Sequence, residues 1–232
     1  MTGTLIVFLK QPRPGGAKTR LVPALGAATA AELYRVLAEE VLRATIPPKG
    51  EYETLVFFAP SEEAEAMRAW LPGLRLRAQS AGDLGARMSA AFARAFERGA
   101  ERVAIIGTDT VGVTGDVVAG ALGALADADV VVGPAHDGGY YLLALSQPHP
   151  DLFEGIAWST PTVLEETLRR AAAAGLRVQK RPVLRDVDTL DDLRAEWPRI
   201  RPLVSGRPEL CQQIEDVLGL PWGEPGGTAW PR

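Results

Sequence analysis

Residues 4–21 read TLIVFLKQPRPGGAKTRL, and the expectation for the whole fold starts from this stretch. Its first six residues are all apolar or β-branched, which is typical of a strand covered on both faces in a parallel sheet. Glycine, proline and basic residues follow at once. In open α/β sheets ligands bind just beyond the carboxyl ends of the strands, so this order predicts a ligand crevice after the first strand.

The rest of the chain repeats the order strand, loop and helix, which favours a three-layer α/β fold with helices on both faces of a mostly parallel sheet. After the first strand, further strands are predicted at 53–59, 74–79, 102–107, 129–133, 140–146 and 177–181. Helices are predicted at 27–45, 62–70, 84–98, 115–126, 161–174, 189–197 and 208–218. Two of the strands follow each other without a helix between them. We therefore expect a local antiparallel insertion and a mixed sheet.

Length and composition indicate one globular domain. The chain has 232 residues, of which 47% are hydrophobic and 23% charged, and we assign 1–205 to a single domain. Residues 206–232 are expected to form a helix and an irregular tail that packs on this domain or forms a partner interface, such as that of a homodimer. No apolar run reaches the ~18 residues of a membrane helix, so no membrane span is expected. A single cysteine and the lack of a leader pattern favour the cytoplasm.

Charge is divided unevenly along the chain. The net charge of −4 argues against a general nucleic-acid binder. Residues 1–31, however, contain four basic and no acidic side chains, and all four basic residues lie between Lys10 and Arg20. A local positive cluster in an acidic chain favours a small anionic ligand over a polyanion.

The loop after the first strand is the candidate phosphate-binding segment, because Gly15 and Gly16 let backbone amides approach an anion. Lys10, Lys18 and Arg20 add positive charge. The spacing matches neither a P-loop nor a dinucleotide-binding turn. The alternative is a flexible basic surface loop.

Acidic residues follow two later strands. Asp109 comes directly after the strand at 102–107, where a carboxylate can hold a divalent cation against ligand phosphates. Asp186 and Asp188 alternate at the end of the strand at 177–181, and one of them could supply a second carboxylate. The alternative for Asp109 is a residue that only shapes its turn.

Gly82, Asp83 and Arg87 form a second candidate nucleotide-binding segment after the strand at 74–79. Here the glycine-rich turn would contact a base or ribose, and Arg87 a phosphate or the acceptor. Alternatively, Asp83 caps the following helix and pairs with Arg87 at i+4.

Two further segments are candidates for binding the acceptor. Gly138 and Gly139 could bring backbone amides close to a substrate, beside Asp137. A tight turn between two strands explains the same residues. Ser159 and Thr160 precede a predicted helix whose N-terminus could hold an anion, with Thr160 as its cap.

These motifs together resemble the DUF2064 family of glycosyltransferase-like proteins, in the nucleotide-diphospho-sugar transferase (GT-A-like) superfamily. The resemblance runs from Lys10 to about residue 193. It rests on five motifs, which are KxPxPGxxKTRL from Lys10, GDLGxRM from Gly82, GPAxDGGYY from Gly133, WST from Trp158 and DVDT from Asp186. The stretch AKTRL at 17–21 is also similar to the first loop of 2-phospholactate guanylyltransferases.

The resemblance implies a mixed sheet of about seven strands, a nucleotide bound at the first loop, and Mg²⁺ near Asp109 and Asp188. One loop departs from the family pattern. The family usually has Ser-Asp-Cys-Pro and then an apolar residue, whereas this chain has TDTVG at 108–112.

The leading hypothesis is a transferase that uses Mg²⁺ or Mn²⁺ and an activated nucleotide, with Lys18, Arg20 and Asp109 as the catalytic groups. Two reactions stay open, namely nucleotidyl transfer from an NTP to a small phosphorylated or carboxylated acceptor and glycosyl transfer from an NDP-sugar. The basic first loop favours the former. A non-catalytic nucleotide-binding protein on the same fold is the alternative from another class. One cysteine and two histidines exclude a Cys/His zinc site.

Overall fold

Among the residues that the computed structural model describes, 3–47 and 50–220, seven strands form one sheet in the order β3-β2-β1-β4-β6-β5-β7. The strands are β1 (Gly3–Lys10), β2 (Tyr52–Ala59), β3 (Leu76–Ala78), β4 (Arg102–Ile106), β5 (Val130–Pro134), β6 (Tyr140–Leu145) and β7 (Val178–Lys180). The helices are α1 (Val22–Leu25), α2 (Ala27–Thr45), α3 (Ala64–Trp70), α4 (Leu84–Glu97), α5 (Gly115–Ala124), α6 (Val163–Ala173), α7 (Leu190–Ile200) and α8 (Pro208–Leu218).

The direction of the strands confirms the predicted mixed sheet. β1 pairs in parallel with β2 and β4, β2 with β3, and β5 with β7. β6 runs antiparallel to both of its neighbours, and Ile106 of β4 stands opposite Leu142 of β6. The strand without a preceding helix is therefore the inserted antiparallel one, because a short turn joins antiparallel strands and a crossover helix joins parallel ones.

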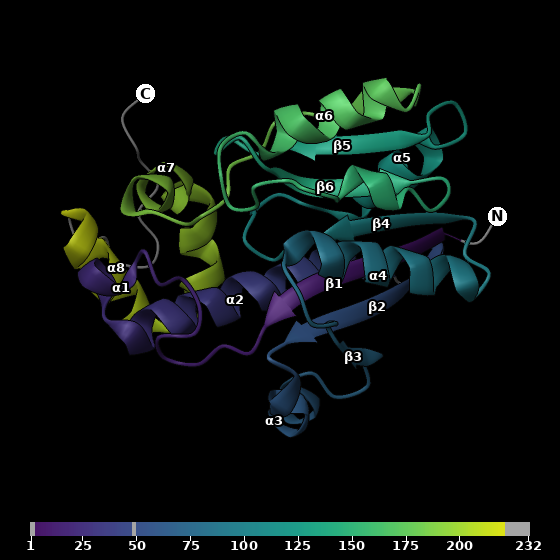
Figure 1. Cartoon of the computed structure of the whole chain (residues 1–232). Coiled ribbons are helices and arrows are strands. Elements are labelled where there is room, and N and C mark those ends of the chain that lie inside the picture. The colour runs from purple at the N-terminus through teal and green to yellow at the C-terminus, as the bar shows by residue number, and fades with distance from the viewer. Residues whose placement is uncertain (1–2, 48–49, 221–232) are drawn as a thin grey trace.

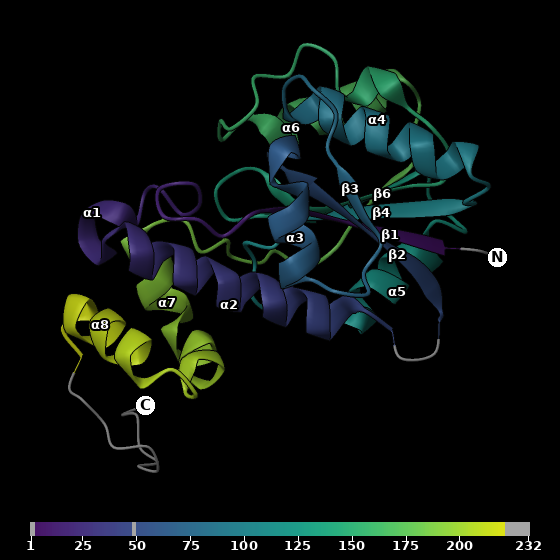
Figure 2. The same ribbon diagram turned by 90° about the horizontal axis from the view of Figure 1, so that it is seen from below.

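The sheet lies between two layers of helices, as Figures 1 and 2 show. Alternate side chains of a strand point to opposite faces. Leu5 and Val7 of β1 pack with residues of α2, α3 and α5, whereas Ile6 packs with residues of α4 and α6. All three side chains are fully buried. This burial on both faces explains why the first strand is continuously apolar.

A third apolar cluster lies beyond the carboxyl ends of β1 and β2 (Figure 1). There Leu33 and Leu37 of α2 pack with Trp197 of α7 and Ile214 of α8. Residue 220 is the last that the structure describes, so most of the predicted irregular tail lies outside the described residues. Across 3–47 and 50–220, the helices are too short or too polar to cross a bilayer.

Two predicted helix starts are wrong by two residues each. α6 begins at Val163 rather than at 161, because the hydroxyl of Thr160 donates to the carbonyl of Ala157 and so does not cap the helix. The segment after Ser61 starts as a 3-10 turn, Ser61–Glu63, before α3 begins, and the hydroxyl of Ser61 makes no cap hydrogen bond.

Candidate functional site

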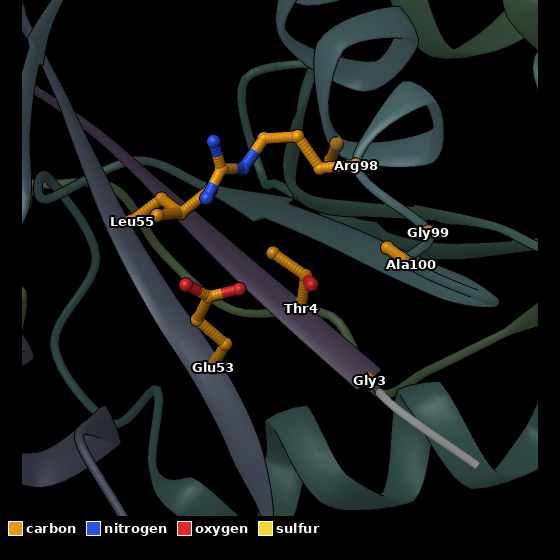
Figure 3. Close-up of a pocket in the computed structure, with 8 residues that line it drawn as sticks. Gly3, Thr4, Glu53, Leu55, Arg98, Gly99 and Ala100 are labelled. Atoms are coloured by element: carbon orange, nitrogen blue, oxygen red, sulfur yellow. The ribbon is translucent and has the colours of Figure 1, made fainter.

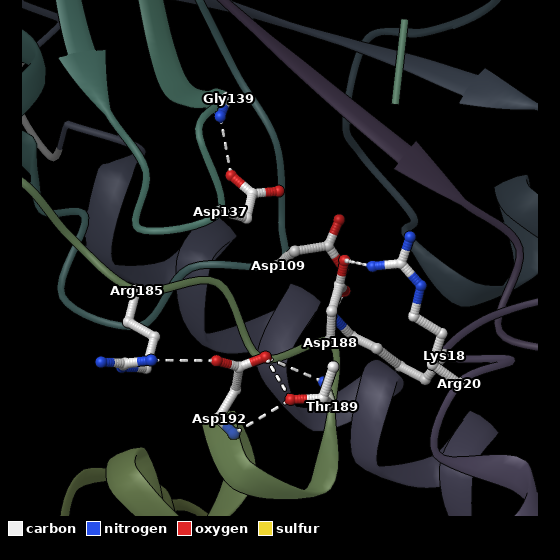
Figure 4. A network of polar contacts seen from close by, with 9 residues as sticks. All are labelled: Lys18, Arg20, Asp109, Asp137, Gly139, Arg185, Asp188, Thr189 and Asp192. Carbon is white, nitrogen blue, oxygen red and sulfur yellow. Dashed lines mark hydrogen bonds and ion pairs between the residues drawn. The ribbon is translucent and has the colours of Figure 1, made fainter. Parts of the chain in front are cut away.

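Loops from opposite ends of the sequence meet at the carboxyl ends of β1 and β4. The ammonium of Lys18, in the loop after β1, lies 2.5 Å from Oδ1 of Asp109 and 3.1 Å from Oδ1 of Asp188. Asp109 follows β4, and Asp188 precedes α7. Figure 4 shows the three side chains converging. The fold therefore brings together the predicted lysine and both predicted metal-binding acids, over separations of up to 170 residues.

Lys18 is buried and charged. Its side chain is only 1% exposed, whereas the carboxylates of Asp109 and Asp188 are 47% and 40% exposed. Burial alone would lower the pKa of Lys18, but Asp109 and then Asp188 outweigh this effect and raise the pKa above its ordinary value. The backbone of Lys18 has φ +50°, a left-handed conformation uncommon for residues other than glycine. The loop thus turns a charged side chain inward onto two acids that remain open to solvent.

The other basic and glycine residues of this loop differ in exposure. A guanidinium nitrogen of Arg20 lies 3.8 Å from Oδ2 of Asp188, and its side chain is 62% exposed. Lys10 is exposed at the end of β1. Gly15 has φ +73°, so the turn itself requires glycine there. A Cβ on Gly16 would lie 2.6 Å from the side chain of Arg13. Of the two basic side chains next to Asp188, Arg20 therefore faces solvent and Lys18 points inward.

An isolated β-bridge and two hydrogen bonds join the loop after β4 to the segment before α7. Thr110 and Asp186 form an isolated antiparallel bridge, and the hydroxyl of Thr110 donates to Oδ1 of Asp186. The carbonyl of Asp109 accepts a hydrogen bond of 2.8 Å from the amide of Val187. Val187 is fully buried. Because side chains alternate along an extended segment, Asp186 and Asp188 face the side opposite to Val187, towards the Asp109 loop.

Asp186 is the most perturbed acid of the site. Burial raises its pKa to about 7, and the charges of Asp109, Asp137 and Asp188 add to this effect, while the hydrogen bond from Thr110 opposes it. Sequence reasoning treated Asp186 and Asp188 as interchangeable until the resemblance favoured Asp188. The structure separates them, because Asp186 bonds to Thr110 and Asp188 bonds to Lys18.

The donor set of Asp109 and Asp188 fits a Mg²⁺ or Mn²⁺ ion. Both are hard carboxylate ligands, and both remain partly exposed. Within the described part of the chain, no group of three or more His, Cys, Asp or Glu side chains is arranged to hold a metal. Mg²⁺ commonly binds through one or two protein carboxylates together with substrate phosphates. Two carboxylates therefore suit a metal that arrives with a phosphate ligand better than one held permanently.

A tyrosine that the sequence analysis did not single out contacts the ends of both β1 and β4. Tyr34 of α2 accepts a hydrogen bond of 2.8 Å from the backbone amide of Lys10, and its hydroxyl lies 3.0 Å from Oγ1 of Thr108. Sequence reasoning missed both side chains, because Tyr34 matches the apolar face of its helix. The only signal in the sequence was a tyrosine, with its polar hydroxyl, among aliphatic residues on that face of the helix.

The predicted acceptor segment at 137–139 packs against residues 161–164, which follow Ser159 and Thr160 in the chain. The carboxylate of Asp137 accepts a hydrogen bond of 2.8 Å from the amide of Gly139, which forms the predicted turn. Gly138 has φ +88°, and a Cβ there would collide with the carbonyl of Pro161. The carbonyl of Gly138 also accepts a hydrogen bond of 2.9 Å from the amide of Leu164. The turn at 137–139 therefore rests against the start of α6, next to Ser159 and Thr160.

The predicted nucleotide-binding segment at 82–87 lies beside the residues just before α6. Asp83 caps α4 through a hydrogen bond of 2.8 Å from Ala86, and Nε of Arg87 donates to the carbonyl of Gly82 at 2.8 Å. A Cβ on Gly85 would lie 2.5 Å from the ring of Trp158. The helix-cap reading of Asp83 is thus correct, while Arg87 bonds to a carbonyl rather than pairing with Asp83.

Two hollows lie outside the Lys18 site. A cavity of about 130 Å³ opens near the amino end of β1 (Figure 3), where Thr4, Glu53 and Arg98 are among its lining residues. A groove of about 450 Å³ runs between α2 and α8. Its side chains already pair with one another, since Arg207 bonds to Glu32. Because ligands of open α/β sheets bind at the carboxyl ends of strands, the cavity near the amino end of β1 does not replace the Lys18 site as the candidate.

Comparisons with known proteins point to one family. A family model described as an uncharacterized protein conserved in bacteria (DUF2064) matches residues 42–160, about half of the chain. A crystal structure from Desulfovibrio desulfuricans G20, of a protein named "putative nucleotide-diphospho-sugar transferase", is 32% identical. The alignment covers 92% of this chain and 99% of that one, with a TM-score of 0.84. A search of curated proteins found no match.

More distant structures share the fold alone. Rv0371c from Mycobacterium tuberculosis H37Rv, solved as a complex with manganese, is 17% identical with a TM-score of 0.51 over 84% of this chain and 97% of that one. The 4-diphosphocytidyl-2C-methyl-D-erythritol synthase of Anaerococcus prevotii DSM 20548 is 10% identical, with a TM-score of 0.55 over 86% and 96% of the two chains. These matches agree with the predicted fold class.

Proposed function

Because the chain belongs to the DUF2064 family, we propose that it is a metal-dependent transferase whose donor substrate is an activated nucleotide. The reaction we favour is nucleotidyl transfer from an NTP to a small phosphorylated or carboxylated acceptor. One observation carries the proposal, namely that a buried Lys18 ammonium contacts two half-exposed carboxylates, Asp109 and Asp188, at the carboxyl ends of β1 and β4. The D. desulfuricans relative, named for nucleotide-diphospho-sugars, supports a nucleotide donor.

Lys18 and Arg20 would bind the phosphates of the nucleotide. They belong to residues 1–31, which contain four basic and no acidic side chains, and a triphosphate needs more positive charge than a diphosphate-sugar. Arg20 faces solvent and can meet an incoming phosphate directly. Lys18 would exchange its carboxylate partners for phosphate oxygens. Lys10, Gly15 and Gly16 would complete this phosphate-binding loop.

Asp109 and Asp188 would hold the Mg²⁺ or Mn²⁺ ion. When bound, such an ion neutralises phosphate charge and polarises the phosphorus that is attacked. The manganese complex of Rv0371c supports a divalent metal on this fold. Catalysis by this chain's own residues would then consist of positioning and electrostatic stabilisation, with no covalent nucleophile.

The remaining predicted residues would bind the rest of the two substrates. Gly82, Asp83 and Arg87 would contact the nucleoside, on the flank of the site next to Trp158. The turn of Asp137, Gly138 and Gly139 would position the acceptor, together with Ser159 and Thr160. The charge of Asp137 helps to raise the pKa of Asp186, so the two carboxylates lie near each other. This supports placing the acceptor next to the acidic residues of the site.

Glycosyl transfer from an NDP-sugar is the second candidate. The observation that favours it is the name of the 32% identical D. desulfuricans protein. The name of the A. prevotii enzyme, a diphosphocytidyl compound synthase, favours nucleotidyl transfer. Both reactions would use the same phosphate and metal residues and differ in the bond that breaks.

A thermal-shift panel of NTPs and NDP-sugars, each with and without Mg²⁺, separates the two candidates. We expect a metal-dependent stabilisation by at least one NTP, and pyrophosphate release when the right acceptor is added. Asp109→Ala should abolish both effects, whereas Asp127→Ala, at an exposed acid after α5, should abolish neither. Stabilisation by NDP-sugars alone would favour glycosyl transfer. Nucleotide binding without turnover across a broad acceptor panel would favour a non-catalytic binding protein, and no response to any nucleotide would refute the proposal.

A further inference from the structure

Tyr34 contacts the chain at two points that lead directly into the candidate site. Its side chain is 3% exposed, within α2. The amide of Lys10 marks the end of β1, where the phosphate-binding loop begins, and it donates to the phenol oxygen at 2.8 Å. Thr108 immediately precedes Asp109, and its Oγ1 lies 3.0 Å from the same oxygen. One hydroxyl therefore joins the ends of β1 and β4.

The ring of Tyr34 also supports the far end of the loop. It belongs to a small buried cluster with Ala17 and Ala38. Ala17 is 3% exposed and directly precedes Lys18. Tyr34 thus contacts the residues immediately before Lys18 and immediately before Asp109, the two side chains that meet at 2.5 Å.

We propose that Tyr34 is a positioning residue, whose hydroxyl fixes the ends of β1 and β4 so that Lys18 and Asp109 face each other. This inference rests on the proposed function for its catalytic meaning, since Tyr34 itself contacts neither the phosphates nor the metal. The positioning is geometric and should not vary with pH near neutrality. Burial raises the pKa of the phenol far above its ordinary value, and the charge of Asp109 adds to this effect.

The hydroxyl matters because one of its two partners, Thr108, is buried. Thr108 is 1% exposed. Tyr34→Phe keeps the ring and its packing on Ala17, but leaves a backbone amide and a threonine hydroxyl without their partner. Unpaired buried polar groups are costly, so the two loops should shift until water or another group reaches them.

A matched control exists at the opposite end of the sheet. Tyr52 begins β2, is 5% exposed, and its hydroxyl donates to the carbonyl of Thr45. Tyr52→Phe removes the same atom from a similarly buried site that lies away from Lys18 and Asp109. Both variants should lose thermal stability, so stability alone cannot distinguish a positioning role from a structural one.

The first readout requires no nucleotide. The chain has four lysines, and Lys18 is 1% exposed while Lys180 is exposed. Acetylation by limiting acetic anhydride, followed by mass spectrometry, gives the labelling rate of Lys18 relative to Lys180. Tyr34→Phe should raise this ratio by about fivefold or more, the scale of one lost hydrogen bond, and Tyr52→Phe should leave it within about twofold. Equal ratios in the two variants would overturn the positioning role.

The second readout is the affinity for an NTP with Mn²⁺, measured by calorimetry. We expect Tyr34→Phe to weaken it by about fivefold or more and Tyr52→Phe to leave it unchanged. Thr108→Val should act like Tyr34→Phe, because it removes the other partner of the same contact. If the wild-type protein binds no nucleotide, the proposed function fails while the labelling experiment still decides the role of Tyr34. If the wild type binds and all variants bind equally, only the role of Tyr34 fails.

Discussion

Replacing Lys18 by methionine should change metal binding and nucleotide binding in opposite directions. Methionine keeps most of the apolar stem and removes the ammonium, which contacts Asp109 at 2.5 Å and Asp188 at 3.1 Å. In the free protein this ammonium offsets about one of the two negative charges that a metal would use. Without it, a divalent cation should bind the free protein more tightly, while nucleotide phosphates lose a cationic partner.

The expected magnitude follows from charge and exposure. Two unit charges 4 Å apart interact by about 1 kcal/mol in water. We take the water value as the minimum, because the carboxylates of Asp109 and Asp188 are 47% and 40% exposed while Lys18 is only 1% exposed. A divalent cation experiences twice this repulsion from Lys18, so its removal should tighten metal binding by at least about 2 kcal/mol, or about 30-fold. Loss of a charge-assisted contact should weaken nucleotide binding by about tenfold or more.

The assay is a Mn²⁺ titration followed by the electron paramagnetic resonance signal of the free ion, with and without an NTP. Lys180→Met, at an exposed lysine of β7, is the control for a simple change in net charge. A thermal melt establishes that each variant is folded. If Lys18→Met binds Mn²⁺ no more tightly than the control and binds nucleotide equally well, Lys18 is a structural ion-pair residue and the reasoning is wrong.

Two further predictions concern stability, measured by urea unfolding. Gly85→Ala should destabilise the protein by about 1–3 kcal/mol, because a Cβ there would lie 2.5 Å from Trp158. Gly123→Ala, where a Cβ meets no atom within 4 Å, should instead stabilise α5 by up to about 1 kcal/mol. Equal effects of the two changes would contradict the close packing of Trp158 on Gly85. Asp192→Ala should cost about 1 kcal/mol at pH 7, because Asp192 and Thr189 form the capping box of α7. Burial would raise the pKa of Asp192, but its hydrogen bonds with Thr189 lower the pKa below its ordinary value. The stability difference between wild type and variant should therefore be full above the unfolded pKa of about 4 and shrink as pH falls further. A stability difference that grows in acid would contradict this.

Much of the fold could be predicted because the informative signals are local. The run Leu5–Leu9 is buried on both faces, as its continuous apolarity predicted. The absence of a helix between residues 134 and 140 predicted the antiparallel strand. The start of α6 was misplaced because Thr160 can cap a helix or bond within a turn, and its hydroxyl donates to Ala157. Only the three-dimensional path of the chain decides between such local alternatives.

Candidate site residues could be proposed from the sequence, but the contacts between them could not. Lys18 and Asp188 stand 170 positions apart, and their contact depends on strand order, which no local pattern encodes. The different surroundings of Asp186 and Asp188 follow from a bridge to Thr110 that joins distant segments. The role of Tyr34 was not predicted, because the use of its hydroxyl depends on where two strands end.

The central claim is that Lys18, Asp109 and Asp188 form a joint site for a metal and nucleotide phosphates. Anomalous diffraction from crystals grown with Mn²⁺ and a stabilising NTP tests it most directly. We expect a manganese peak within coordination distance of Asp109 and Asp188, with the ammonium of Lys18 moved onto a phosphate. A manganese ion bound elsewhere, or a bound nucleotide with Lys18 still bridging the two carboxylates, would contradict it.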